Sequence, residues 1–341
     1  YFDTLIIAHR HYHLQPERMC LAMKCSCDRL IKSLDAYISK ADDDLADALT
    51  EAGFIEADST VTEAAAIEEQ VAAALTGETD YILNGAKEAI DLEAFAKTVW
   101  PNIKAGDMVA QDLFEIFLEE FNTFMPTLVS GYIAQLDGCL ILDQISKRTK
   151  AWIKSWSEEL AGLMKLDSHT QIDNLLTTAL DKGQSVAELT QSIMDSGIRD
   201  EYYRARRVSI TETLRAHSYA SEEAILQAPV VEEKEWVHTG AYRNTPRENH
   251  VAMDGIRVPK KEAFTLEGAD GGTYYPMFPR DSILPAGESI NCHCIHRGIV
   301  SEQVLGLPIE ERRRLQEEAV AEMDEDWEKE LDAKNKAKAG I

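Results

Sequence analysis

The chain of 341 residues is long for one compact core, and its formal net charge is −25 at pH 7. We therefore expect two domains, or one domain with an extended helical part. This charge argues against broad binding to phosphate backbones, which requires a basic surface. The six cysteines are too few for a disulfide scaffold, and no apolar run approaches the roughly 20 residues of a membrane span. We expect a soluble chain with reduced thiols, made in a cytoplasm and without a secretion signal.

The first thirty residues are rich in histidine and cysteine, the usual ligands of zinc. The residues concerned are His9, His11, His13, Cys20, Cys25 and Cys27. Their spacing fits no known zinc motif, and histidines at every second position share one face of a strand. We therefore expect an exposed extended segment followed by cysteines on a helix, without a metal.

Residues 29–125 show apolar side chains at steps of three and four, which indicates amphipathic helices. Asp and Glu are concentrated in this part of the chain. Thr60 and Glu63 have the spacing of a capping box, and Gly77 is a suitable helix stop. We expect one helix to begin near Thr60 and to end at Gly77.

Two further features follow in the same region. Trp100-Pro101 and Lys104–Asp107 together predict a corner, because proline disfavours helix at the residue before it. Apolar residues, most of them phenylalanines, then recur at helical spacing from Leu113 to Phe124. We expect this stripe to pack in a core, with a ligand pocket as the less frequent alternative.

One segment combines basic and aromatic residues: Lys147, Arg148, Lys150, Trp152, Lys154 and Trp156. Such a strip can contact a nucleic-acid backbone, and the basic cluster Arg204–Arg207 is a second candidate for the same role. The alternative is a buried tryptophan face flanked by solvated lysines. We favour the buried face.

Residues 165–226 read as further helices. Ser185 and Glu188 form a second expected capping box. In the last of these helices an apolar face is predicted for Tyr203, Ile210, Leu214, His217 and Ala224. Glu212 lies beside this face. It could act as a general base, but an ion pair with Arg215 is the more common arrangement.

The segment from Trp236 to Cys294 is dense in turns, aromatic residues, histidine and cysteine. We predict a strand at 235–239, then a helix from Pro246 to Met253 that has Thr245 as its cap and carries His250. Asp254-Gly255 is a turn pair, and 256–258 can form a strand. The glycine-rich loop at 268–272 lacks the spacing of a phosphate-binding loop.

The two cysteines of this segment lie in a stretch that we predict to be a strand. Period two would place Cys292, Cys294 and His296 on one face, where same-side residues are about 6.8 Å apart. Two thiolates on one tetrahedral zinc ion lie about 3.8 Å apart, so the strand would have to bend for both cysteines to bind. We expect cysteines packed beside His250 without metal, and keep zinc held by His250, Cys292 and Cys294 as the alternative.

Several motifs together resemble those of the phage Mu F-like minor head protein (phage head morphogenesis) family. They are I-T-E-T at 210–213, W-V-H-T-G at 236–240, R-x-x-P-R-E-N-H-x-x-M-D-G at 243–255, F-x-L at 264–266, P-x-D at 279–281 and N-C-x-C at 291–294. In this pattern His250, Asp254-Gly255, Asp281 and the two cysteines stand at the expected positions. His293 stands where arginine is common, and an aspartate usual after the tryptophan region is not obvious. The resemblance covers about residues 165–300.

The resemblance and the helical pattern together imply an α-rich fold in three parts. We expect an elongated N-terminal helical region at 1–160 for contacts with portal or capsid. A small α+β Mu F-like domain would follow at 161–300, and a charged C-terminal helix and tail at 301–341.

The function implied by the resemblance is that of a minor capsid protein of a tailed bacteriophage. Such a protein lies inside the head near the portal and assists head assembly and DNA packaging or ejection. Its expected partners are the phage portal protein, with major capsid or scaffold protein and packaged DNA as further candidates, and no membrane. It would be made in the host cytoplasm and enter the virion. No catalytic or cofactor-binding residue is assigned.

The alternative function is a nuclease- or ADP-ribosyltransferase-like enzyme. His250 would then be the general acid/base, Arg247 or Arg257 would stabilise an anion, and Glu212 would assist.

Overall fold

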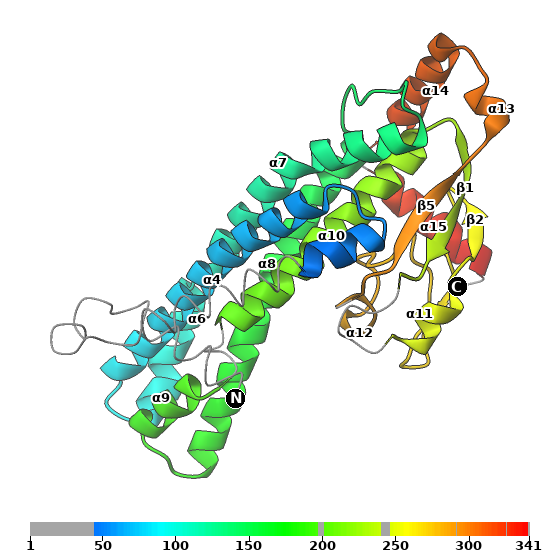
Figure 1. The fold of residues 1–341 in the computed structure, drawn as a ribbon. Coiled ribbons are helices and arrows are strands. Elements are labelled where there is room, and N and C mark those ends of the chain that lie inside the picture. The colour runs from blue at the N-terminus through cyan, green and yellow to red at the C-terminus, as the bar shows by residue number, and fades with distance from the viewer. Residues whose placement is uncertain (1–43, 197–200, 240–245, 291, 325, 340–341) are drawn as a thin grey trace.

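The structure is a computed structural model, which describes residues 44–196, 201–239, 246–290, 292–324 and 326–339. Long helices form an elongated bundle, and a small lobe of strands and short helices lies against one end of it (Figure 1). The predicted fold class, α-rich with a small α+β part, is thereby confirmed. The long helices are α4 (Ala57–Glu88), α7 (Val109–Leu136), α8 (Lys147–Asp181) and α10 (Glu201–Gln227).

The core of the bundle is built on aromatic side chains. Phe117 and Phe121 of α7 are fully buried and stack with ring centroids 6.1 Å apart. Trp152 of α8 lies 5.9 Å from Phe121 and stacks on Tyr219 of α10 at 3.9 Å. The phenylalanine stripe is therefore core, as predicted, and Trp152 and Trp156 form the predicted buried face.

The predicted boundaries of α4 are wrong at both ends. The helix begins at Ala57, and Gly77 lies well inside it. The Thr60 hydroxyl donates to the carbonyl oxygen of Glu56 at 2.8 Å and does not cap the helix. Burial of one continuous apolar face against α7 and α10 outweighs the local cost of a glycine within the helix.

The end of the bundle far from the sheet is closed by short helical segments. They are α5 (Leu92–Ala94), the π-helical segment η1 (Phe95–Val99), α6 (Trp100–Gly106) and α9 (Val186–Met194). The predicted corner is confirmed at Lys104–Asp107, because α6 ends at Gly106 and α7 begins at Val109. It is wrong at Trp100-Pro101, where η1 passes directly into α6 and Pro101 lies in the first turn of α6. The predicted capping box of Ser185 and Glu188 is confirmed at the start of α9.

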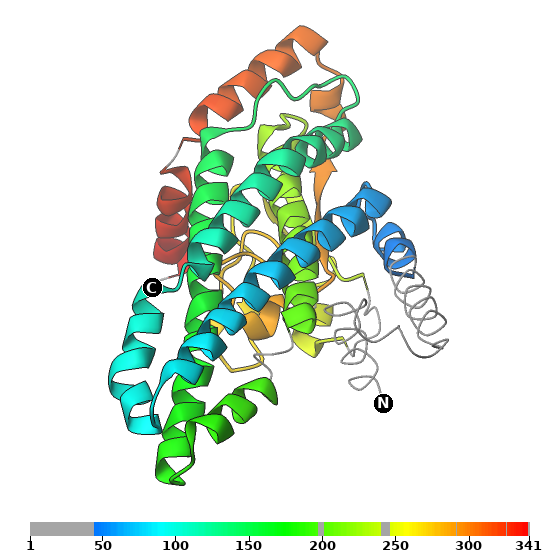
Figure 2. The ribbon, with the colours of Figure 1, turned by 90° about the vertical axis from the view of Figure 1, so that its left-hand side faces the viewer.

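Helix α10 is the central element of the molecule. It packs against α4 and α7 on one side and against the strands β1 (Val231–Val237) and β5 (Ile295–Val300) on the other. Figure 2 shows it behind α4 and α7. Leu214, His217 and Ala224 are buried as predicted, whereas Tyr203 is 57% exposed. Because both sides of α10 are covered, its polar residues need partners within the protein.

The strands are β1 (Val231–Val237), β2 (Arg257–Pro259), β3 (Leu266–Glu267), β4 (Thr273–Tyr274) and β5 (Ile295–Val300). The antiparallel order β2-β1-β5 places β1 in the middle of a three-stranded sheet, and β3 and β4 form a separate hairpin. In the register of β1 and β5, Trp236 lies opposite His296. The strand predicted at 235–239 exists, but it begins and ends earlier in the chain.

The C-terminal part returns to the bundle as α13 (Glu302–Leu305), α14 (Ile309–Glu322) and α15 (Trp327–Ala339). Arg312 of α14 pairs with the buried Asp137 that follows α7. Trp327 of α15 packs on the guanidinium of Arg148, and α15 lies beside α8 (Figure 2). Within the described ranges, no helix has the length and apolarity needed to cross a bilayer.

Helix α8 runs through residue 160 without a break. The domain boundary predicted there stays a prediction.

Candidate functional site

A histidine and two cysteines meet in the interior of the α+β lobe. His250 lies on α11 (Glu248–Ala252), and Cys292 and Cys294 lie between α12 (Ala286–Ser289) and β5. Nδ1 of His250 is 3.5 Å from Sγ of Cys292 and 3.7 Å from Sγ of Cys294. The three ligand atoms lie within 4.8 Å of one another, and all three residues are buried. We call this group the His–Cys cluster.

The predicted strand through the two cysteines is wrong, because β5 begins only at Ile295. The amide of Cys292 donates to the carbonyl oxygen of Ser289 at 3.3 Å, which continues the turn of α12. Nη1 of Arg280 donates to the carbonyl oxygen of Cys292 at 2.6 Å. The chain therefore turns at the cysteines, and the distance argument against a shared ligand, which assumed a regular strand, does not apply.

Glu288 fixes the orientation of the His250 ring. Nε2 of His250 lies 2.8 Å from one carboxylate oxygen of Glu288. The amide of Ala269 and the side-chain amide of Asn249 donate to the same carboxylate at 2.8 and 3.1 Å. Because a carboxylate accepts, Nε2 carries the proton, and Nδ1 faces the two sulfur atoms.

His238 adds a second imidazole at the edge of the cluster. It follows the last residue of β1, is half-buried, and places Nδ1 3.5 Å from Sγ of Cys294. Its backbone amide donates to Asp254 at 2.8 Å, and the neighbouring Thr239 hydroxyl donates to the carbonyl oxygen of His293 at 2.7 Å. These bonds join the end of β1 to the turn after α11 and to the cysteine segment.

Aromatic and aliphatic side chains enclose the cluster. Trp236 is fully buried and meets the rings of His250 and Phe264 edge-on, with centroids 5.9 and 5.3 Å away. Met253 and Leu284 belong to the same apolar group. The cluster therefore lies in a dry interior, where charged and metal-bound groups interact strongly.

The acid–base state of the cluster follows from its contacts. The pKa of Cys292 is well below its usual range, chiefly because the Cys294 thiol donates to it and also because of His250. The same hydrogen bond, together with burial, raises the pKa of Cys294. Burial lowers the pKa of His250, but Cys292 and Glu288 outweigh this effect, so the pKa is raised. The contacts favour a Cys292 thiolate beside a protonated His250.

Arg280 forms hydrogen bonds that hold the cysteine segment in place, and no sequence motif indicates this role. Its side chain is buried, and its backbone has a φ of 66°, an unusual value for a residue with a side chain. Besides Cys292 it donates to the carbonyl oxygen of Leu214 at 3.0 Å and to the Ser218 hydroxyl at 2.6 Å. Among the described residues no carboxylate forms an ion pair with it. Burial lowers the pKa of its guanidinium, and the two cysteines offset only part of this effect.

The helix that carries His250 is shorter than predicted. It begins at Glu248, with Arg247 at its N-cap, so Pro246 precedes it. Thr245, the predicted cap, lies outside the described residues. Gly255 has a φ of 78°, which fits the predicted Asp-Gly turn.

The residues of the enzymatic alternative do not form a shared site with His250. Glu212 accepts from Trp156 at 2.7 Å and pairs with Arg215 at 2.8 Å, the predicted structural ion pair. Arg257 pairs with Glu235 on the neighbouring strand. Arg247 donates to the carbonyl oxygen of Ile290 at 2.6 Å.

A buried ion pair, also missed by sequence reasoning, joins the sheet to α10. Nζ of Lys234 on β1 donates to Glu222 and to the carbonyl oxygen of Met277, each at 2.7 Å. Nε2 of His296 on β5 lies 3.0 Å from the other oxygen of Glu222. Burial raises the pKa of Glu222, but Lys234 and His296 outweigh it, so the carboxylate stays ionised.

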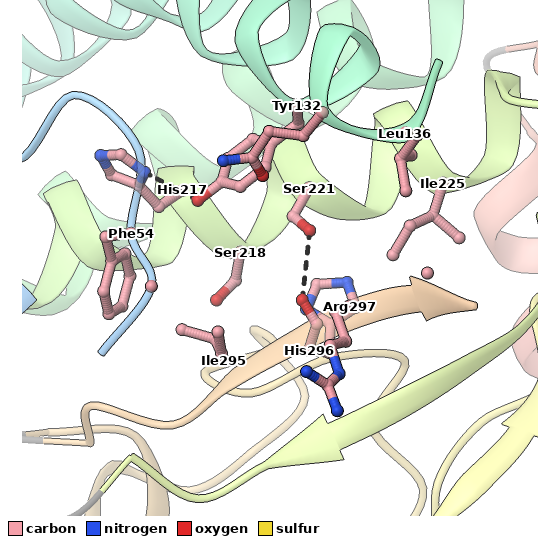
Figure 3. A pocket seen from close by; sticks show the side chains of 13 residues that line it. Phe54, Tyr132, Leu136, His217, Ser218, Ser221, Ile225, Ile295, His296 and Arg297 are labelled. Atoms are coloured by element: carbon pink, nitrogen blue, oxygen red, sulfur yellow. Dashed lines mark hydrogen bonds between the residues drawn. The ribbon is translucent and has the colours of Figure 1, made fainter. Parts of the chain in front are cut away.

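A small cavity of about 60 Å³ lies between α7, α10 and β5 (Figure 3). Its wall includes Phe54, Tyr132, His217 and His296. His217 bonds the hydroxyl groups of Thr60 and Tyr132 at 2.7 and 3.1 Å, and burial lowers its pKa to about 3, which keeps it neutral. Sites for small molecules are usually about 300–1,000 Å³. We interpret the cavity as a packing gap.

A second group of metal-type ligands lies between α4, α7 and α8. It comprises Glu78, Asp107 and His169. His169 lies 2.7 Å from Asp107, and the Ser168 hydroxyl donates to Glu78 at 2.9 Å. Burial raises the pKa of Glu78 to about 7. These groups are already bonded to neighbours on adjacent helices, which indicates a packing role.

In each of the two basic strips, the fold uses at least one arginine in a contact with an acidic residue. Arg148 is buried beside Glu223 at 3.5 Å, while Lys147, Lys150 and Lys154 are exposed. Arg206 pairs with Glu68 at 2.9 Å. The histidines and cysteines predicted near the start of the chain lie outside the described residues.

Comparison with known proteins agrees with the motifs. Residues 170–297 match the family described as phage Mu protein F like protein. An uncharacterized protein of Bacillus subtilis (strain 168), YqbB, is 37% identical over 214 residues, which are 63% of this chain and 68% of that protein. No solved structure matches the chain. The matched family region contains α10, the sheet and the His–Cys cluster, and the chain therefore belongs to the phage Mu protein F like family.

Proposed function

We propose that this protein is a minor capsid protein of a tailed bacteriophage that lies inside the head near the portal and assists head assembly. The observation that carries the proposal is the family match over 170–297, because the family supports a role in phage head morphogenesis. The YqbB protein is uncharacterized and adds no further detail.

The architecture of the described residues suits an assembly component. The His–Cys cluster is enclosed by apolar side chains, and Glu212, Arg247 and Arg257 bond to other partners. This arrangement stabilises a shape and does not favour the enzymatic alternative.

The end of the bundle far from the sheet is the part that we expect to contact the portal. Several large apolar side chains are exposed on its helices and turns: Ile90 at 95%, Met108 at 61%, Leu163 at 50%, Leu166 at 62%, Leu180 at 45% and Met194 at 43%. Exposed apolar side chains of this kind are typical of protein–protein contact surfaces. Major capsid protein, scaffold protein and packaged DNA are further candidate partners. For DNA, the net charge of −25 restricts contact to local basic patches.

The test is the copy number of the protein in proheads assembled with and without the portal protein. We expect the protein to co-purify with complete proheads and to be lost from proheads without portal. An undiminished copy number in portal-free proheads would reject the portal contact. Absence of the protein from all particles would reject the capsid role as well.

A further inference from the structure

We propose that the His–Cys cluster binds one zinc ion, with His250, Cys292 and Cys294 as three ligands and His238 as the fourth. The argument uses the geometry of the lobe and does not depend on the proposed role in the phage head.

Three sulfur–nitrogen distances within the proposed ligand set match those of a tetrahedral zinc site. With Zn–S near 2.3 Å and Zn–N near 2.0–2.1 Å, sulfur and nitrogen ligands lie about 3.6 Å apart. Nδ1 of His250 lies 3.5 and 3.7 Å from the two sulfur atoms, and Nδ1 of His238 lies 3.5 Å from Sγ of Cys294. These three separations each match the expected sulfur–nitrogen distance to about 0.1 Å, and His250, Cys292 and Cys294 form the compact part of the ligand set.

The hydrogen bond behind His250 is a second, independent observation. Metal-bound histidines almost always donate their other ring N–H to a carboxylate, a carbonyl oxygen or water. Glu288 accepts from Nε2 of His250 at 2.8 Å and is itself held by the amide of Ala269. The ring is thereby fixed with Nδ1 aimed at the sulfur atoms.

His238 completes the ligand set from the edge of the cluster. Its Nδ1 atom is not one of the three ligand atoms that lie within 4.8 Å of one another. A small movement of the His238 ring must therefore bring Nδ1 to the ion. Its side chain is half-buried and can make this movement more easily than the buried His250.

The chemical types of the four proposed ligands indicate which metal ion the site would bind. Two thiolates and two imidazoles suit zinc, whereas calcium and magnesium require oxygen ligands. The buried Arg280 lies beside the cysteines and favours their negative charge. The ion would join α11, the end of β1 and the segment before β5, which explains how such short elements keep one arrangement.

Metal content of the full chain tests the site. The background should carry Cys20→Ser, Cys25→Ser and Cys27→Ser, which removes the thiols near the start of the chain. We expect about one zinc ion per chain by mass spectrometry. Cys292→Ser, Cys294→Ser and His250→Ala should each lose it, while Cys139→Ser, a change at an exposed cysteine, should retain it.

A variant can lose zinc simply because it fails to fold. Replacement of zinc by cobalt in the same background therefore provides a second test, because the cobalt spectrum reports the ligands directly. We expect the visible bands of tetrahedral cobalt together with thiolate-to-cobalt charge-transfer bands. Their absence, or a Cys292–Cys294 disulfide in protein purified without metal uptake, would overturn the proposal. Equal loss of zinc in Cys139→Ser would do the same. Full retention of zinc and an unchanged cobalt spectrum in His238→Ala would remove His238 from the ligand set.

Discussion

Glu288 and His250 form a hydrogen-bonded pair in which each residue stabilises the protonation state of the other. The carboxylate is buried and accepts three hydrogen bonds, one of them from the imidazole. Burial raises the pKa of Glu288, but the amide of Ala269 and the side chains of Asn249 and His250 outweigh it, so the pKa is lowered. The acid is therefore ionised, and it can hold the proton of His250 at Nε2.

Replacement of Glu288 by alanine should weaken metal binding without removing a ligand. We expect zinc affinity to fall about 10–100-fold, the usual effect of losing such a partner. Competition with a chromophoric chelator measures this change. Glu248→Ala, at an exposed position of α11, the helix that carries His250, is the control and should bind as the parent chain does. Unchanged affinity in Glu288→Ala would contradict the orienting role.

Lys234 is the residue on which the attachment of the sheet to α10 depends. Lys234→Met should destabilise the protein by about 3–5 kcal/mol, because Glu222 would be left as a buried charge without its strongest partner. Urea unfolding followed by circular dichroism measures the loss.

Two further variants identify the cause of that loss. Lys234→Met combined with Glu222→Leu should recover part of the stability, since no buried charge then lacks a partner. Lys261→Met, which breaks an exposed pair with Glu322, should have little effect. If the double variant is as unstable as the sum of its two single changes, the explanation by an unpaired charge is wrong.

At the scale of elements, hydrogen bonds between buried polar side chains join the helices in the half of the bundle far from the sheet. Glu78 of α4 is 4% exposed and accepts from Ser168 of α8. Its other carboxylate oxygen accepts no hydrogen bond from the described part of the chain, and burial raises the pKa of Glu78 from 4.5 to about 7. An acid whose pKa is raised in the folded state favours folding less as pH rises between the two values.

The variant Glu78→Gln should remove this pH dependence. Below about pH 4.5 both chains keep a neutral side chain at this position, and their stabilities should be similar. Between pH 4.5 and 7 the parent should lose stability relative to Glu78→Gln, by up to about 3 kcal/mol. Chemical unfolding of both chains across this pH range measures the difference. A constant difference would show that Glu78 does not titrate as stated.

The cysteine segment is the element where local pattern and tertiary contacts disagree. Alternation from Ser289 to Val300 is typical of a strand, and the part from Ile295 onward forms β5. The part before it turns, because α12 ends at Ser289 and Arg280 holds the carbonyl oxygen of Cys292. A one-dimensional pattern contains no signal for a guanidinium that arrives from another loop.

At the scale of the whole molecule, the protein has an elongated bundle with a lobe at one end (Figure 1). The family match covers residues 170–297, which include the end of α8, α9, α10 and most of the lobe. The far end of the bundle lies partly inside this match, and we propose it as the contact for a partner in the head.

Leu163→Lys combined with Leu166→Lys should prevent incorporation of the protein into proheads. Both side chains are at least half exposed on α8, so the fold should tolerate lysine there while an apolar contact would not. Quantitative mass spectrometry of purified proheads gives the copy number. The matched control is Val251→Lys with Ile256→Lys, two comparably exposed apolar positions in the lobe. Equal incorporation of both double variants would contradict a portal contact at this end.

The sequence by itself determined the helical character of the chain, the phenylalanine core of α7, the capping box of α9 and the family. These features depend on residues close together along the chain, and their periodicity or spacing is visible in one dimension. It also supplied His250, Cys292 and Cys294 as candidate ligands. Only the tertiary structure decided that the three meet, that His238 and Glu288 join them, and that Lys234 and Arg280 hold the lobe on α10. Those contacts join residues far apart in sequence, and their energy comes from burial and charge pairing that exist only after the chain has folded.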